Sequence, residues 1–179
     1  MTEKRAVPPR ALIVCASRHH GNTHKVAVAM AKAFGAQVVE PEAVAISDVR
    51  DYDVLGFGSG IYFGVSDPEL IDLVDRLPPG AGQPVFTFST SGSFLLPTLG
   101  TSHLRNRLRD RHYDVVGDFN CRGLDTVGLL RFIGGVNRGR PDERDLDRAT
   151  DFAEDVALHV AGRAAATEAT VAAGASRRS

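Results

Sequence analysis

Five short apolar runs, alternating with segments of helical spacing, are the feature that most constrains the fold of this chain. The runs lie at residues 12–16, 37–40, 53–58, 84–88 and 114–119. The first is apolar throughout, which is typical of a strand buried on both faces. Helical patterns occupy residues 23–35, 67–77, 101–111 and a segment that begins near residue 141. Because parallel strands need crossover connections, the alternation predicts an α/β fold: a doubly wound, five-stranded parallel sheet with helices on both faces.

The helical segments carry start and stop signals. Gly35 is a natural end for the first, and Ser66-Asp67-Pro68-Glu69 is a typical helix start. Residues 41–50 show no clear pattern and are interpreted as a connection. The segment 101–111 is expected to bury Leu104 and Leu108 and to show four arginines to solvent, namely Arg105, Arg107, Arg109 and Arg111. Those arginines are interpreted as a solvated face, with a docking surface for an acidic redox partner as the alternative.

Length and charge limit the possible classes of function. A chain of 179 residues fits one domain, expected at residues 11–162, with a flexible leader at 1–10 and an Ala-rich, disordered tail at 163–179. A formal net charge of −1 argues against nucleic acid as a partner. No apolar stretch approaches the roughly 20 residues that span a bilayer, so we expect no membrane partner and a cytoplasmic location. The two cysteines do not form a disulfide scaffold, and the oligomeric state stays open.

Three polar loops follow the first, third and fourth strands, so the topology predicts that they meet at the carboxyl edge of the sheet. The first, residues 17–23, precedes a helix and offers hydroxyls and backbone N–H groups where the helix dipole favours an anion. The second, residues 59–66, offers glycines and the planar groups Tyr62 and Phe63. The third begins Ser89-Thr90-Ser91-Gly92. A phosphate at one loop and a polar slot with aromatic groups at the others suit a mononucleotide that carries a planar heterocycle.

These motifs resemble the flavodoxin family. Its phosphate loop has the form Ser/Thr-x-x-x-Gly-Asn-Thr, which matches residues 17–23, and the resemblance runs from Ala11 to about Gly162. The chain is also similar to a flavodoxin-like group with a Cys-x-Gly-x-Asp-Thr stretch (residues 121–126) and a Gly-Gly-x-Asn-x-Gly-x-Pro run (residues 134–141). The resemblance implies strand order 2-1-3-4-5 and noncovalently bound FMN.

The resemblance also implies which residues contact FMN. Residues expected at the phosphate are Ser17, Arg18, His19, Gly21, Asn22 and Thr23. Those expected along the flavin ring are Ser59, Gly60, Ile61, Tyr62, Phe63, Gly64, Ser89, Thr90, Ser91, Gly92 and Cys121. For Cys121 a structural role is the alternative. No catalytic side chain and no metal ligand is expected.

The leading functional hypothesis is an electron carrier between a reductase, linked to NAD(P)H or ferredoxin, and a client redox protein. Three departures from the flavodoxin pattern support an alternative, an FMN-dependent oxidoreductase that acts directly on a quinone or small metabolite. The chain has no tryptophan to flank the flavin, it is nearly neutral where flavodoxins are acidic, and its long loop at residues 121–140 carries arginines. Cations near the ring would stabilise the reduced flavin anion and raise its potential. A flavin-free binding or assembly protein is the third hypothesis.

Two further patterns have simpler interpretations. His20 and His24 have the i, i+4 spacing of a metal pair on a helix, but the phosphate loop explains them as neighbours of the anion. The run Gly58-Ser59-Gly60 is not a hydrolase nucleophile elbow, because Phe57 stands where Gly-x-Ser-x-Gly needs its first glycine.

Overall fold

One parallel sheet organises the protein. The computed structural model describes residues 8–17, 21–61, 65–91, 97–123, 137 and 139–176. The sheet has the order β2-β1-β3-β4-β5, and every neighbouring pair is parallel. Its strands are β1 (Ala11–Ala16), β2 (Gln37–Val39), β3 (Val54–Gly60), β4 (Pro84–Ser91) and β5 (Asp114–Arg122). The predicted doubly wound fold and its strand order are confirmed.

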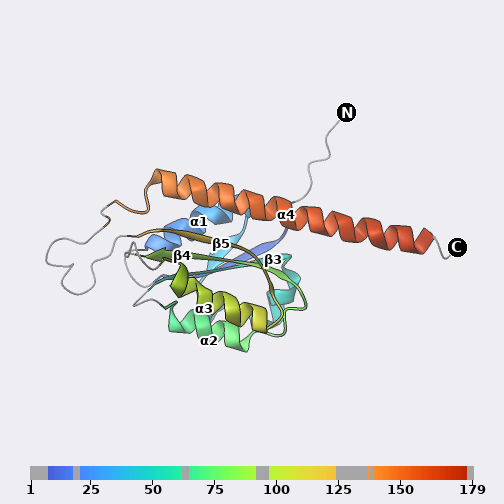
Figure 1. Ribbon diagram of the computed structural model, residues 1–179, viewed down its shortest axis with the longest axis horizontal. Coiled ribbons are helices and arrows are strands. Elements are labelled where there is room, and N and C mark those ends of the chain that lie inside the picture. Colours follow the sequence, from blue (N-terminus) through green and yellow to red (C-terminus); the bar gives the residue numbers. More distant parts are fainter. Residues whose placement is uncertain are drawn as a thin grey trace.

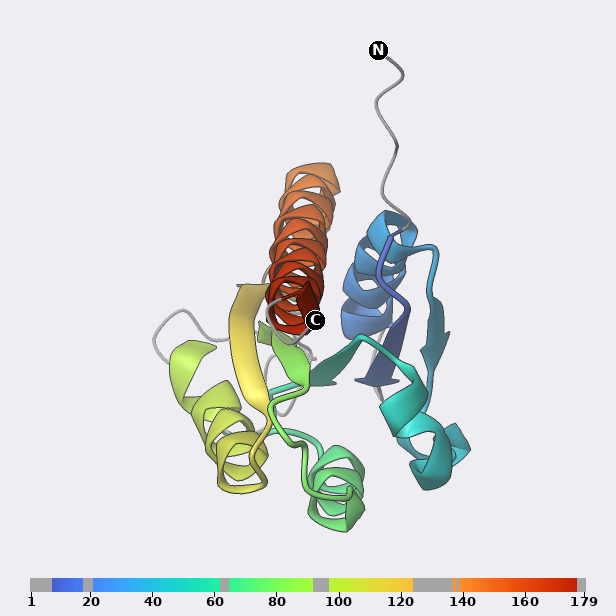
Figure 2. The same cartoon turned by 90° about the vertical axis from the view of Figure 1, so that its right-hand side faces the viewer.

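Helices cover both faces of the sheet. Helices α1 (Asn22–Phe34) and α4 (Glu143–Ser176) lie side by side on one face, and α2 (Pro68–Arg76) and α3 (Pro97–Asp110) lie on the other (Figures 1 and 2). Two short 3₁₀ helices, η1 (Pro41–Ala43) and η2 (Ile46–Asp51), form the connection that carried no clear pattern.

Each face of the sheet has its own core. The rings of Phe86 and Phe88 lie under α1 and α4, where Phe86 stacks on Phe34 with ring centroids 5.9 Å apart. Gly56 and Gly58 on β3 leave room for these rings, since a Cβ at either position would overlap the facing phenylalanine. The opposite face is an aliphatic core that joins the sheet to α2 and α3.

The strands extend further toward the carboxyl edge than the sequence predicts. We expected β3, β4 and β5 to end at residues 58, 88 and 119, and they continue to Gly60, Ser91 and Arg122. The added residues are Gly, Ser, Thr, Asn, Cys and Arg, several of which resemble turn residues in isolation. Ladder pairing with neighbouring strands holds them extended, as between Gly60 and Thr90. Tertiary context here overrides local propensity.

Helix α4 runs well past the end of the sheet (Figure 1). It is helical to Ser176, so most of the segment expected as a disordered tail is helix. Alanine has the best intrinsic helix propensity, and two threonines bond back onto the helix: Thr167 to the carbonyl of Arg163 at 3.0 Å and Thr170 to that of Ala166 at 2.9 Å. Residues 162–167 are exposed, and Arg163 ties the start of this stretch to Asp114 at the beginning of β5.

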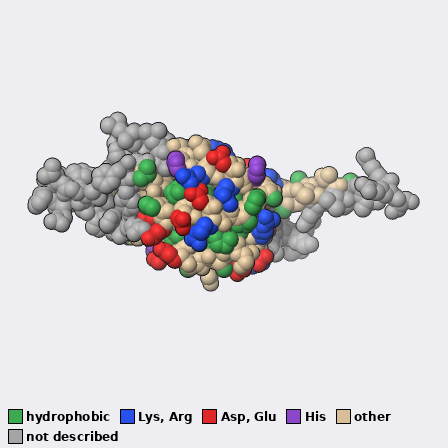
Figure 3. Space-filling view, turned by 90° about the horizontal axis from the view of Figure 1, so that it is seen from below, with side chains coloured by type: hydrophobic (Ala, Val, Ile, Leu, Met, Phe, Trp, Pro, Cys, Tyr) green, Lys and Arg blue, Asp and Glu red, His purple; other side chains and the backbone are tan. Residues whose placement is uncertain are grey.

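The α2/α3 face carries interspersed basic and acidic side chains (Figure 3). The prediction that all four arginines of α3 and its C-terminal turn face solvent is wrong in part. Arg105 binds Asp118 at 3.0 Å, and Arg111 donates to the carbonyl of Leu77. Long side chains with several donors reach acceptors on neighbouring elements that helical periodicity does not reveal. Within the described residues, no helix is long and apolar enough to cross a membrane.

Candidate anion site at the carboxyl edge of the sheet

The first turn of α1 forms the base of the candidate site. Gly21 is its N-cap and has a left-handed backbone (φ 62°), a conformation that strains residues with a Cβ. The first hydrogen bond within the helix runs from the Lys25 N–H to the Gly21 carbonyl at 3.0 Å. The N–H groups of the turn before Lys25 have no acceptor within the helix, which is the usual condition for binding an anion.

Ser17 and the charges around α1 add to this site. The Ser17 hydroxyl accepts a long hydrogen bond, 3.4 Å, from the backbone N–H of His24, so it lies over the first turn. That turn contains no acidic residue. The dipole of the helix contributes roughly half a positive charge at this end. Exposed His24 and Lys25 stand beside it, and the local field therefore favours an anion.

Thr23 connects this helix start to the end of β4. Its side chain is buried, and its hydroxyl is 2.8 Å from the hydroxyl of Thr90. Gly123, directly after β5, closes the same junction: its N–H donates to the Ser91 carbonyl at 3.0 Å. A Cβ on Gly123 would lie 3.1 Å from the Asn22 amide nitrogen and 3.2 Å from Thr90. Glycine thus permits this close approach.

The end of β3 joins the same edge. The Ile61 N–H donates to the Thr90 carbonyl at 3.0 Å, beyond the last paired residue of β3. Ser59 is buried, and its hydroxyl serves the protein itself: it accepts from the N–H of Asp67 at 2.7 Å and donates to the Gly60 carbonyl at 2.5 Å. Asp67 then caps α2 by accepting from the Glu69 N–H at 3.0 Å. Ser59 therefore anchors the loop rather than presenting its hydroxyl at the edge.

A polar ladder runs along β4 and β5 toward this edge on the side that faces α3. We use this name for three pairs in register: Thr87 with Asp118, Ser89 with Asn120, and Ser91 with Arg122. Thr87 donates to Asp118 at 2.6 Å, and Ser89 donates to Asn120. The Asn120 amide in turn donates to Asp118 at 3.1 Å. The Ser89 hydroxyl is thus engaged within the sheet.

Cys121 packs in the core beneath α4 and is 8% exposed. Burial, reinforced by the negative charge of Asp145, raises the pKa of its thiol to about 12. Cys15 is also buried, and burial together with the charge of Glu40 raises its pKa to about 12. These placements favour the structural alternative for Cys121.

Of the residues predicted at the site, the structure brings Ser17, Gly21–Thr23, Gly60–Ile61 and Thr90–Ser91 to one edge. Six lie outside the described residues: Arg18, His19, Tyr62, Phe63, Gly64 and Gly92. His20, half of the possible metal pair, also lies outside them. Within the part that is described, no group of three or more His, Cys, Asp or Glu residues could hold a metal.

Sequence reasoning did not assign three residues that organise this edge: Asn120, Gly123 and Asn137. Asn137 donates to the Gly123 carbonyl at 3.3 Å, which holds these two residues together beside the end of β5. Gly123 and Asn137 fall within the two motifs noted after β5. The signal for Asn120 was the alternation of polar residues Asp118, Asn120 and Arg122 along one strand.

Sequence comparisons identify one curated relative of this chain. No protein-family model matches the sequence. An uncharacterised protein of Methanocaldococcus jannaschii is 33% identical over 147 residues, which is 82% of this chain and 97% of the relative.

Solved structures with the same fold include three of note. Oxidised flavodoxin 2 from Bacillus cereus matches with a TM-score of 0.63 and 20% identity, over 84% of this chain and 99% of that one. A flavodoxin from the domain Archaea matches with a TM-score of 0.63 and 17% identity, over 84% and 97%. The rubredoxin oxygen:oxidoreductase of Desulfovibrio gigas matches with a TM-score of 0.67 and 15% identity, over 88% of this chain and 38% of that one.

The sheet order, the helix start after β1 and the convergent strand ends define an α/β protein of flavodoxin-like fold with a candidate anion site at its carboxyl edge. The relative from Methanocaldococcus jannaschii aligns over nearly its whole length. The chain has the flavodoxin-like fold and belongs to the same family as this uncharacterised protein.

Proposed function

We propose that this protein binds FMN noncovalently at the carboxyl edge of its sheet and carries electrons between a reductase and a client redox protein. One observation carries the proposal most: the first turn of α1 has no acidic residue, begins at left-handed Gly21 and lies directly beside the ends of β3 and β4. FMN would supply the redox chemistry when bound. The flavodoxins of similar fold support this assignment.

The threonine pair suggests how the phosphate would be held. A phosphate oxygen accepts hydrogen bonds, so it needs a donor from the protein. If the Thr90 hydroxyl donates to Thr23, the Thr23 hydroxyl keeps its own proton for the phosphate. Thr23 is then the donor to the anion, and Thr90 orients it. The first-turn N–H groups and the Ser17 hydroxyl complete the donor set.

Variants at the pair test this arrangement. Thr23→Val keeps the shape of the side chain and removes the donor. Losing one hydrogen bond to a charged group costs about 1.5–3 kcal/mol, so we expect FMN affinity to fall roughly 10- to 100-fold. Thr23→Ser should retain the affinity within a few-fold. Thr167→Val is the matched control, because the hydroxyl of that threonine bonds the carbonyl of Arg163 within its own helix, far along α4.

Fluorescence titration of each apoprotein with FMN measures these affinities. Equal affinity for wild type and Thr23→Val would place the phosphate elsewhere. A loss in Thr23→Val that Thr23→Ser does not recover would assign the effect to altered packing.

The position of Arg122 favours direct oxidoreductase activity as a second candidate. Arg122 is exposed at the end of β5, on the edge where the flavin is proposed to bind, and a cation there would stabilise the reduced flavin anion. Steady-state oxidation of NAD(P)H with a quinone, with and without an added reductase, separates the two functions. A carrier turns over only with the reductase, whereas fast turnover without it would identify an enzyme.

A further inference from the structure

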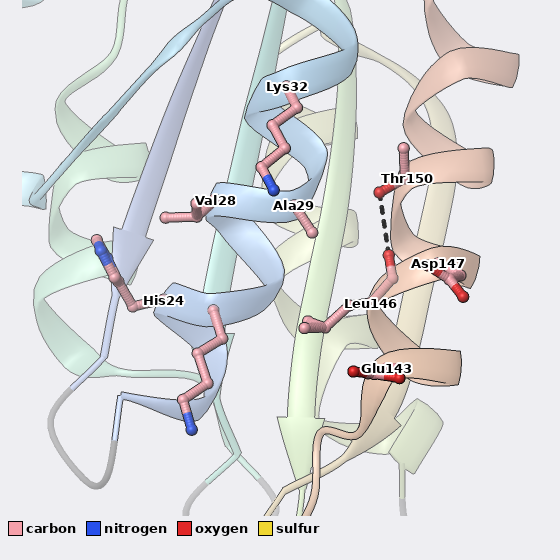
Figure 4. Close-up of a pocket in the computed structure, with 9 residues that line it drawn as sticks. His24, Val28, Ala29, Lys32, Glu143, Leu146, Asp147 and Thr150 are labelled. Carbon is pink, nitrogen blue, oxygen red and sulfur yellow. Dashed lines mark hydrogen bonds between the residues drawn. The ribbon is translucent and has the colours of Figure 1, made fainter.

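A groove on the outer surface between α1 and α4 adjoins the proposed flavin site at His24 and Lys25 and extends away from it along both helices. Its volume is about 530 Å³. Figure 4 shows the two helices side by side and parallel, with Leu146 pointing toward α1, Lys32 and Thr150 at one end of the groove, and Glu143 at the other. Val28, which also lines it, is 40% exposed.

The two walls of this groove carry opposite charges. Helix α1 contributes Lys25 and Lys32, and α4 contributes Glu143 and Asp147. All four side chains are exposed. Across the described part of the chain, none of the four makes an ion pair, although other surface charges do, as between Arg76 and Asp72 at 3.1 Å. The face is therefore a basic stripe and an acidic stripe, side by side and unpaired.

The acidic stripe continues along α4 beyond the groove. At helical spacing, Glu154 follows Asp147 by seven residues, and Leu158 follows Glu154 by four. Leu158 is 72% exposed, the most exposed of the large hydrophobic side chains described. Farther on, the helix leaves the body of the protein (Figure 1). Helix α4 is about 50 Å long, against about 20 Å for α1, so some 30 Å of α4 extends past the end of α1.

We infer that this α1/α4 face pairs with the same face of a second copy of the chain, about a two-fold axis parallel to the helices. Such an axis places α1 of each copy opposite α4 of the other with the helices parallel. Lys25 then faces the acidic first turns of the partner's α4, and Lys32, seven residues along, faces the region of Thr150 and Glu154. Each contact occurs twice, as an isologous interface requires.

Charge complementarity selects this arrangement. A two-fold axis perpendicular to the helices would instead place lysines opposite lysines and carboxylates opposite carboxylates. The parallel arrangement also sends both extensions of α4, each with an exposed Leu158, in the same direction. The inference does not depend on flavin binding.

Sedimentation velocity over a range of protein concentrations tests the inference. We expect the wild type to sediment as a species of twice the 19.2 kDa chain mass. Lys25→Glu/Lys32→Glu makes the whole face acidic, and Glu143→Lys/Asp147→Lys makes it basic. Each should raise the dimer dissociation constant roughly 100-fold, because like charges then face each other twice. Arg109→Glu, an exposed reversal on α3, is the control and should leave the dimer unchanged.

An equimolar mixture of the two reversed variants provides the sharpest readout. In a heterodimer both charge contacts are opposite again, so the mixture should sediment as a dimer while each variant alone is a monomer. This rescue also shows that both variants are folded. A monomeric wild type, a dimer that survives either reversal, a mixture that stays monomeric, or a control that dissociates equally would each overturn the inference.

Discussion

Asp118 is the centre of the polar ladder, and replacing it tests how much that ladder contributes to the stability of the fold. Its carboxylate accepts four hydrogen bonds: from Thr87 at 2.6 Å, Arg105 at 3.0 Å, Asn120 at 3.1 Å and Thr101 at 3.3 Å. These donors come from β4, β5 and α3. Asp118→Ala removes all four acceptor contacts and leaves the Arg105 charge without this partner.

The structure sets the size of the effect. Breaking a fully buried ion pair costs about 3–5 kcal/mol. The side chains of Asp118 and Arg105 are 13% and 25% exposed, so water relieves part of the penalty. We therefore expect Asp118→Ala to lower the free energy of unfolding by about 2–4 kcal/mol. With a urea m-value of about 2 kcal/mol/M, the midpoint should fall by roughly 1–2 M.

Urea denaturation followed by circular dichroism measures this loss, and a second substitution assigns it. Arg105→Met removes the stranded charge, so the double variant Asp118→Ala/Arg105→Met should recover part of the stability. A coupling free energy of about 1 kcal/mol or more is expected from the cycle. A loss below about 0.5 kcal/mol for Asp118→Ala, in the range of an ordinary surface substitution, would refute the reasoning.

Two further predictions follow from buried groups. Gly58→Ala places a methyl group against the Phe88 ring, and overpacking of this kind costs about 1–3 kcal/mol of stability. Thermal unfolding should show a fall in Tm of roughly 2–10 °C. An unchanged Tm would mean that the ring moves aside freely. The thiols of Cys15 and Cys121, with pKa values raised from 9.0 to about 12, should resist alkylation at pH 8 until the protein unfolds. Because the folded state favours the neutral thiols, their contribution to stability is complete below pH 9 and should be lost as the pH rises from 9 toward 12; a stability that is flat over this range would contradict the prediction.

The topology could be predicted from sequence because the apolar residues of each core strand and helix recur with the spacing of that secondary structure. The apolar run Ala11–Ala16 and the spacing of Val26, Met30 and Phe34 in α1 agree with the structure. The strand ends could not be predicted, because Ser89–Ser91 and Ser59–Gly60 have the composition of turns. Only ladder bonds to neighbouring strands, distant in sequence, make them extended.

The sequence predicted which strand ends meet at one edge of the sheet, but not the hydrogen bonds that the side chains make there. The order of the loops placed Ser17, Gly21 and Thr90 at one edge, since carboxyl ends of parallel strands share that edge. That Ser59 bonds Asp67, and that Ser89 bonds Asn120, depends on which side of the sheet each hydroxyl faces. A segment interpreted as a loop does not show which face of the sheet each side chain points to. Both serine hydroxyls were therefore expected to face the ligand.

Titration of the apoprotein with FMN tests the central proposal most directly. Flavin fluorescence should be quenched with a sharp break at one FMN per chain, and the purified protein should be yellow. The Thr167→Val control should give the same curve as wild type. A colourless protein whose addition leaves FMN fluorescence unchanged, and whose Tm does not rise with FMN, would contradict the account.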